Sequence, residues 1–186
     1  GDYMMKKILL TSTGFDNENI KNKFLALLDR DIKNVKVLFV ITAAINPEAI
    51  RVLPFCLDDL NKCGILDENI RIYDMHKPLS DMEISKYDAI YVCGGDTEHL
   101  VERINEINFK ETVNEYIKQG GIYIGVSAGS VCASGEYQNG LDFITNKLDV
   151  HCEKGTENGL VTSSDNLYLT DNQAIYISDD KKIIFE

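Results

Sequence analysis

Short apolar runs rich in β-branched residues recur along the first two thirds of the chain, and stretches with helical spacing separate them. Each run is apolar almost throughout, which is typical of strands covered on both faces in a parallel sheet. The alternation predicts crossover helices between parallel strands and therefore an α/β fold, a three-layer sandwich with a mostly parallel sheet. The expected strands are Lys6–Thr11, Val35–Ile41, Ile70–Tyr73, Ala89–Cys93 and Ile122–Val126.

The segments between these runs have the features of helices. Apolar residues of the first segment recur on one helical face, and the second begins with Pro47, which a helix tolerates in its first turn. Glycines mark two helix ends, Gly64 and Gly120. The expected helices are Asn17–Leu28, Pro47–Lys62, a stretch that begins after Thr97, and Phe109–Gln119.

The pattern changes after Ala133, where no further long amphipathic helix is expected. Residues 167–177 and 182–185 are rich in strand-forming side chains, and Asp179 and Asp180 between them favour a turn. This predicts an antiparallel β extension at the C-terminal end of the sheet. Because no internal repeat or long linker divides the chain, we expect residues 1–186 to form one domain.

Composition narrows the classes of partner. The 186 residues carry a formal net charge of −11, whereas binding to nucleic acid or to an anionic membrane requires a basic surface. The longest apolar stretch, around Val37 to Ile45, is far shorter than the roughly 20 residues that span a bilayer. We therefore expect no nucleic-acid partner and no membrane anchor.

The N-terminus and the cysteines suggest a cytoplasmic protein. Residues 1–3 are expected to be left over from cloning, and no apolar signal region follows them. The five cysteines are odd in number and contain no C-x-x-C pair, so neither a disulfide framework nor a zinc knuckle is predicted. The three histidines show no metal-binding spacing, and we expect no metal and no cofactor. Whether the chain forms a homodimer is left open.

The run Gly125-Val126-Ser127-Ala128-Gly129 matches G-x-S-x-G and directly follows an expected strand. A serine between a strand end and a helix start makes a sharp turn that exposes its hydroxyl as a nucleophile. The N–H of Ala128 would then face developing negative charge. The pattern alone is weak, because small residues also occur where a turn merely packs closely.

A second glycine-rich turn, Cys93-Gly94-Gly95-Asp96-Thr97, also ends an expected strand, where ligand sites collect in open α/β sheets. Acyl transfer needs a second backbone donor for the oxyanion, and the N–H of Gly95 is our candidate. The same turn can simply start a helix, with Asp96 or Thr97 as N-cap, and the two interpretations are compatible.

A serine nucleophile needs a base, and His151 is preferred because it follows a strand-like segment downstream of Ser127. His76 remains an alternative, whereas His99 is expected on a helix surface. For the acid that orients the base we prefer Glu136 and then Asp142, both of which lie between the serine and the histidine.

Three segments together resemble the peptidase E group of serine peptidases. They are the Gly94–Thr97 turn, the elbow at residues 125–130, and the segment Gly140-Leu141-Asp142-Phe143 that leads to His151. That group lies in the class I glutamine-amidotransferase-like superfamily, so the resemblance implies a flavodoxin-like sandwich. It also implies a triad in the order serine, acid, histidine, with Ser127 as nucleophile, His151 as its histidine, and Gly95 and Ala128 as oxyanion donors.

The implied activity is hydrolysis of short peptides after an N-terminal aspartate. Asp96 stands where the family turn has asparagine and is assigned to substrate binding. An aspartate pocket needs a cation, and Lys154 is the only basic residue between His151 and Leu167. Two alternatives remain: a non-catalytic module that binds a small molecule or a protein, and, more remotely, ammonia release from glutamine, which in related enzymes uses a cysteine at the elbow.

Overall fold

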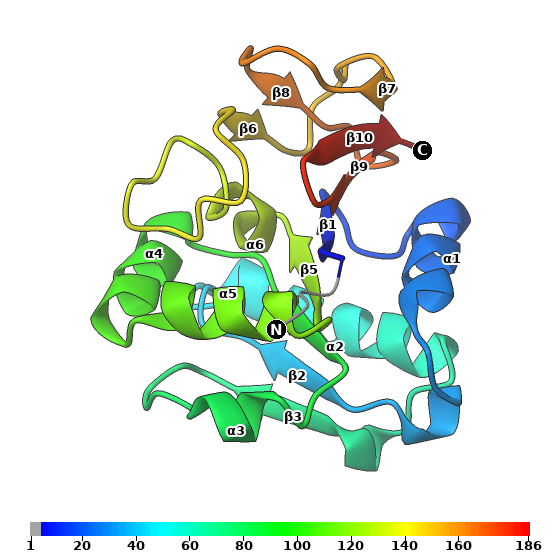
Figure 1. Cartoon of the computed structure of the whole chain (residues 1–186), viewed down its shortest axis with the longest axis vertical. Helices are drawn as coiled ribbons and strands as arrows, with labels where there is room; N and C mark the ends of the chain where they lie inside the picture. Colours follow the sequence, from blue (N-terminus) through cyan, green and yellow to red (C-terminus); the bar gives the residue numbers. More distant parts are fainter. Residues whose placement is uncertain (1–4) are drawn as a thin grey trace.

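A computed structural model describes residues 5–186, and the expected cloning remnant at 1–3 lies outside the described residues. Its main sheet has eight strands in the order β3-β2-β4-β5-β1-β9-β10-β7 (Figure 1). The strands β3, β2, β4, β5 and β1 run parallel, and β9, β10 and β7 continue the sheet antiparallel. The α/β class and the antiparallel C-terminal extension are therefore confirmed.

The five parallel strands coincide with the five expected apolar runs, some with slightly shorter ends. They are β1 (Lys7–Thr11), β2 (Val37–Val40), β3 (Ile70–Tyr73), β4 (Ala89–Val92) and β5 (Ile122–Val126). Every residue of β2, β4 and β5 is buried, as expected for strands that helices cover on both faces.

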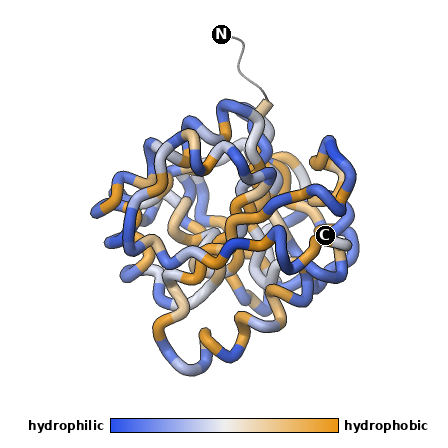
Figure 2. The backbone as a smooth tube through the Cα atoms, turned by 90° about the horizontal axis from the view of Figure 1, so that it is seen from below, coloured by the Kyte–Doolittle hydropathy of each residue, from blue (hydrophilic) through white to orange (hydrophobic). Residues whose placement is uncertain are grey.

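Helices form the two outer layers. One face of the sheet packs against α1 (Glu18–Leu27) and α2 (Pro47–Lys62) through a core that includes Phe24, Phe39 and Leu60. The opposite face packs against α3 (Asp81–Ile84), α4 (Thr97–Glu106), α5 (Phe109–Lys118) and the single turn α6 (Ala128–Val131). Figure 2 shows apolar segments through the centre of the molecule, with hydrophilic segments mostly around them.

The local sequence explains where these helices begin. Asn17 and Asn46 cap α1 and α2 through their side-chain oxygens, and Ser80 forms a capping box with Glu83 at α3. Asn108 separates α4 from α5 in the left-handed conformation (φ 55°). Two short 3-10 helices, Ile32–Asn34 and Asp67–Asn69, complete the connections.

The last third contains short strands and irregular segments. β6 (Leu148–Asp149) pairs with β8 (Leu167–Tyr168) in a separate two-stranded sheet, whereas β7 (Gly159–Leu160), β9 (Ala174–Ser178) and β10 (Lys181–Phe185) join the main sheet. Because β9 pairs with β1, the chain just before β9 lies at the carboxyl end of the parallel strands. Within residues 5–186, no helix is both long and apolar enough to cross a membrane.

Candidate active site

Ser127 lies at the end of β5 in a strained backbone conformation, with φ 53° and ψ −112°. A residue other than glycine held in such a sparsely populated conformation costs about 1–3 kcal/mol, and such residues cluster at active sites. Gly125 makes the turn possible, since a Cβ at that position would lie 2.4 Å from the carbonyl oxygen of Gly129. The elbow expected from G-x-S-x-G is thus present as a strand, a sharp turn and one turn of helix.

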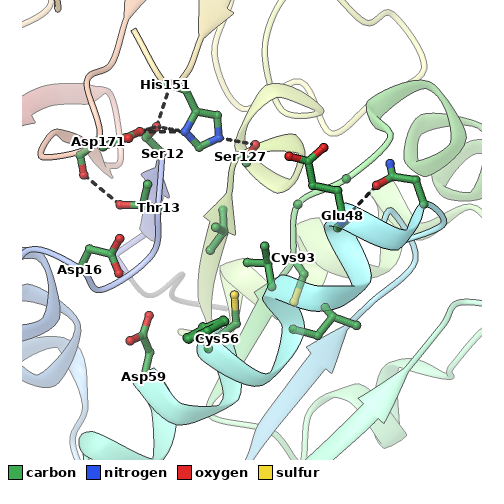
Figure 3. Close-up of a pocket in the computed structure, with 18 residues that line it drawn as sticks. Ser12, Thr13, Asp16, Glu48, Cys56, Asp59, Cys93, Ser127, His151 and Asp171 are labelled. Atoms are coloured by element: carbon green, nitrogen blue, oxygen red, sulfur yellow. Dashed lines mark hydrogen bonds and ion pairs between the residues drawn. The ribbon is translucent and has the colours of Figure 1, made fainter. Parts of the chain in front are cut away.

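His151 faces the serine hydroxyl, with 3.0 Å between its Nε2 and the Oγ of Ser127 (Figure 3). Its own backbone is also left-handed, with φ 58°. The backbone N–H of His151 donates to the Oγ of Ser12 at 2.8 Å, which fixes the start of the imidazole side chain. The structure therefore brings together the two residues that the sequence paired.

The residue bonded to the other imidazole nitrogen corrects an expectation. Asp171 Oδ1 lies 2.7 Å from His151 Nδ1. Glu136, the acid preferred from the sequence, is exposed, and its backbone N–H donates to the Oγ of Ser134 at 3.4 Å. Asp142 lies 3.8 Å from the Nζ of Lys110. The carboxylate beside His151 thus follows the histidine in the chain, and the order is serine, histidine, acid.

Backbone pairing outside the parallel sheet explains this order. The backbone N–H of Leu169 donates to the carbonyl oxygen of Asp149 at 2.9 Å, and the backbone N–H of Cys152 donates to the carbonyl oxygen of Leu169 at 2.9 Å. These two bonds hold the turn at Asp171 next to His151, although 20 residues separate them. The signal in the sequence is the run Thr170-Asp171-Asn172, whose side chains favour a turn before β9.

Ser12, which sequence reasoning missed, completes the network. Its Oγ donates to Asp171 Oδ1 at 2.9 Å and lies 3.2 Å from His151 Nδ1. Burial raises the pKa of Asp171, but the hydrogen bonds from His151 and Ser12 outweigh it, so that the pKa lies below its usual value. The carboxylate therefore stays ionised and accepts a hydrogen bond from Nδ1–H of His151, which leaves Nε2 free to accept a hydrogen bond from the Ser127 hydroxyl.

The second glycine turn lies against Ser127. A Cβ on Gly94 would be 3.0 Å from the Cβ of Ser127. Gly95 has φ 140°, and a Cβ there would lie 2.0 Å from the carbonyl oxygen of Ala43, so the turn requires glycine. Within residues 5–186, the backbone N–H groups of Gly95 and Ala128 have no hydrogen-bond acceptor. Both donors expected for an oxyanion are thus free beside Ser127.

The other expected residues lie elsewhere. Asp96 caps α4 by accepting from the N–H of His99 at 2.9 Å, and Lys154 is exposed; neither lines the cavity at Ser127. His76, the alternative base, pairs with Asp74. In residues 5–186, no three His, Cys, Asp or Glu side chains are grouped as a metal ion would require, and the cysteines are unpaired.

A cavity of about 580 Å³ opens beside Ser127 (Figure 3), within the range of small-molecule sites. The loop after β1, residues 48–59 of α2 and the two glycine turns form its walls. Its lining comprises Ser12, Thr13, Asp16, Asn46, Glu48, Ala49, Val52, Leu53, Phe55, Cys56, Asp59, Cys93, Gly94, Gly95, Val126, Ser127, His151 and Asp171.

Two crystal structures share this fold. A protein assigned to peptidase E from Listeria monocytogenes EGD-e superposes with a TM-score of 0.74 at 22% identity, covering 98% of this chain and 99% of that chain. A peptidase from an acI-B1 Actinobacterium superposes with a TM-score of 0.66 at 13% identity, covering 100% of this chain and 89% of that one. At these identities the similarity bears on the fold alone.

Curated sequence relatives are uncharacterized peptidases. One from Listeria monocytogenes is 28% identical over 130 residues, which cover 70% of this chain and 62% of the relative. One from Pasteurella multocida is 26% identical over 135 residues, covering 70% and 61%. The matched region thus spans about three fifths of the length of these relatives.

The sequence model of peptidase family S51 matches residues 8–148, from β1 to β6. The match includes both glycine turns, at Gly94 and at the Ser127 elbow, but ends before His151 and Asp171, whose placement rests on the structure. Since it covers well over half of the sequence and agrees with the fold, the chain belongs to peptidase family S51.

Proposed function

We propose that the chain is a serine-type hydrolase that cleaves short peptides through Ser127, His151 and Asp171. The observation that carries this proposal is the continuous set of hydrogen bonds from Asp171 through His151 to the hydroxyl of a strained Ser127. Membership of a peptidase family supports peptide-bond hydrolysis. The hydrogen bond between Asp171 and His151 also favours catalysis over the alternative of a non-catalytic binding module.

The proposed reaction has two halves. Ser127 Oγ attacks the carbonyl carbon while its proton passes to Nε2 of His151, and the ionised Asp171 stabilises the imidazolium. The N–H groups of Gly95 and Ala128 hold the resulting oxyanion. The C–N bond then breaks, and the amine leaves with the proton from His151. A water molecule attacks the acyl-enzyme in the same way and releases the acid.

The oxyanion donors act as individual N–H groups. Because α6 has only four residues, its dipole adds little to the positive potential at Ala128. A preorganised donor of this kind contributes about 10²–10³ in kcat.

The aspartate preference implied by the resemblance to peptidase E has less support here. An aspartate side chain needs a cationic partner, yet no lysine or arginine is among the described residues lining the cavity. We therefore propose peptide hydrolysis as the function and treat Asp-X dipeptides as one substrate class to be tested.

Labelling with a fluorophosphonate followed by peptide mapping tests the nucleophile directly. We expect the label on Ser127, and we expect Ser127→Ala and His151→Ala to abolish labelling and the hydrolysis of dipeptides and simple esters. Ser164→Ala, at an exposed serine outside the cavity, is the matched control and should behave as wild type. Ligand-induced stabilisation without labelling or turnover would favour the binding module.

A further inference from the structure

Two cysteines lie next to each other in the wall of the cavity beside Ser127. Cys56 belongs to α2, and Cys93 is the residue that directly follows β4 (Figure 3). A hydrogen bond joins their thiols, and both side chains belong to the same buried cluster between α2 and the sheet. Neither forms a disulfide. Two free thiols are thus in contact at the proposed active site.

The other three cysteines lack this arrangement. Cys132 is fully buried in the core on the opposite face of the sheet. Cys63 and Cys152 are partly exposed, but neither lines the cavity. In the described part of the chain, the hydrogen bond between Cys56 and Cys93 is the one that joins two thiols.

The two thiols differ in the ease with which they lose a proton. The hydrogen bond from Cys93 lowers the pKa of Cys56 and outweighs the opposite effect of burial. Burial raises the pKa of Cys93, which therefore keeps its proton and donates it in this hydrogen bond. Because the thiolate is the reactive form of cysteine, Cys56 is the nucleophile of the pair and Cys93 its neighbouring thiol.

The cavity gives a small molecule access to both sulfur atoms. Cys56 and Cys93 are only 5% and 1% exposed, and cysteines buried to this extent are usually inert. These two differ because they line a cavity of about 580 Å³ that also reaches Ser127. A hydroperoxide is small enough to enter it.

Cys93 is directly connected to the turn that holds a proposed oxyanion donor. It precedes Gly94 and Gly95, and a Cβ on Gly94 would lie 3.0 Å from the Cβ of Ser127. A covalent bond draws two sulfur atoms closer together than a hydrogen bond does, so forming it would displace Cys93 and the N–H of Gly95. A displacement of about 1 Å can cost about 10² in rate.

We propose that Cys56 and Cys93 form a reversible disulfide that switches off hydrolysis at Ser127. The oxidant is a hydroperoxide, of which hydrogen peroxide is the simplest. The effect on hydrolysis rests on the proposed function, whereas formation of the disulfide does not.

The oxidation has two steps. The thiolate of Cys56 attacks one oxygen of hydrogen peroxide and becomes a sulfenic acid, while the O–O bond breaks and the other oxygen leaves as hydroxide and takes up a proton. The sulfur of Cys93 then attacks the sulfur of Cys56 and loses its proton, and the hydroxyl group of the sulfenic acid leaves as water. In total the two thiols lose two electrons and two protons, and the peroxide becomes two water molecules. A dithiol reductant reverses the change by thiol–disulfide exchange.

Peptide mapping and activity of the oxidised wild type test the proposal together. The protein is treated with hydrogen peroxide, and its remaining thiols are alkylated with N-ethylmaleimide in denaturant. We expect a peptide pair linked through Cys56 and Cys93 and a kcat/KM for a simple ester that is at least about tenfold lower, with both changes reversed by dithiothreitol. Alkylation of both thiols after peroxide treatment, a loss of activity that dithiothreitol does not reverse, or unchanged activity with the disulfide formed would overturn it.

Variants locate the effect, each compared with its own reduced form. Cys56→Ala should keep its kcat/KM after peroxide treatment, and Cys93→Ala should form no disulfide. Cys63→Ala, at the end of the same helix and outside the cavity, is the matched control and should be inactivated and restored as wild type is. Inactivation of Cys56→Ala to the same extent as Cys63→Ala would place the oxidation elsewhere and contradict the proposal.

Mapping of Ser127→Ala separates this inference from the proposed function, because it requires no turnover. A disulfide between Cys56 and Cys93 in this variant, together with no hydrolysis by the reduced wild type, would support the thiol pair while the hydrolase proposal failed. Hydrolysis by the reduced wild type with no such disulfide after peroxide treatment would leave the hydrolase standing and remove the inference.

Discussion

Replacing Asp171 with asparagine separates the acid found in the structure from the acid expected from the sequence. The change keeps the shape of the side chain but removes the charge that accepts from His151 Nδ1 at 2.7 Å. The new amide group can donate to Nδ1, which would place the imidazole hydrogen on Nε2, opposite the Ser127 hydroxyl. The serine would then lose its base.

The size of the expected loss in kcat depends on how far Asp171 and His151 are buried. A buried aspartate in this role is worth about 10⁴ in kcat. The side chains of His151 and Asp171 are 49% and 61% exposed, so solvent takes over part of the stabilisation of the imidazolium. We therefore expect Asp171→Asn to lower kcat by about 10³, or about 4 kcal/mol of transition-state stabilisation.

The assay compares kcat and KM of the wild type, Asp171→Asn and Glu136→Gln on one simple ester and one dipeptide. Glu136→Gln is the matched control, because it removes the charge of the exposed carboxylate that the sequence favoured. Circular dichroism melts establish that both variants fold. A normal kcat in Asp171→Asn, or a loss confined to Glu136→Gln, would refute the role of Asp171.

Three further predictions concern single residues. Ser12→Ala removes one hydrogen bond to the charged Asp171 and should lower kcat about tenfold with little change in KM, whereas a change in KM alone would contradict a positioning role. Gly125→Ala forces a Cβ to within 2.4 Å of a carbonyl oxygen and should reduce the free energy of unfolding by about 1–3 kcal/mol in urea titrations, and an unchanged midpoint would contradict the packing argument. Burial raises the pKa of Asp59 in the folded protein above its value in the unfolded chain. Protonated Asp59 therefore favours the folded state below the unfolded-state pKa, and this contribution to stability is lost as the pH rises through the folded-state pKa. Asp59→Asn should therefore melt at a higher temperature than wild type at pH 7 and converge with it below about pH 4, and a difference independent of pH would exclude this cause.

The parallel part of the sheet could be predicted because strands that are buried on both faces consist almost entirely of apolar residues, which are easily recognised in the sequence. Strands such as β2 and β5 are short, continuous apolar runs, and the helices between them have capped or proline-containing starts. The start of α5 at Phe109 agrees with the expected helix, whereas the left-handed backbone of Asn108 before it could not be read from the local pattern.

The positions of Ser127 and His151 were also accessible from sequence, since one follows a recognisable elbow and few histidines exist in the chain. The acid was not, because its place depends on which segments pair beyond the parallel sheet. Asp171 reaches His151 only through pairing of the segment before β9 with residues 149–152, and such long-range contacts cannot be read from spacing. Ser12 was missed for a similar reason, as 139 residues separate it from His151.

The position of Asp171 in the chain has a consequence for the order of synthesis. Ser127 and His151 leave the ribosome first, but the carboxylate is placed only after the segment before β9 has paired with residues 149–152. On the proposed mechanism, a nascent chain, or a fragment cleaved before residue 171, contains the nucleophile and base without the group that orients them. Full hydrolytic activity would thus begin only when this last part of the chain has folded.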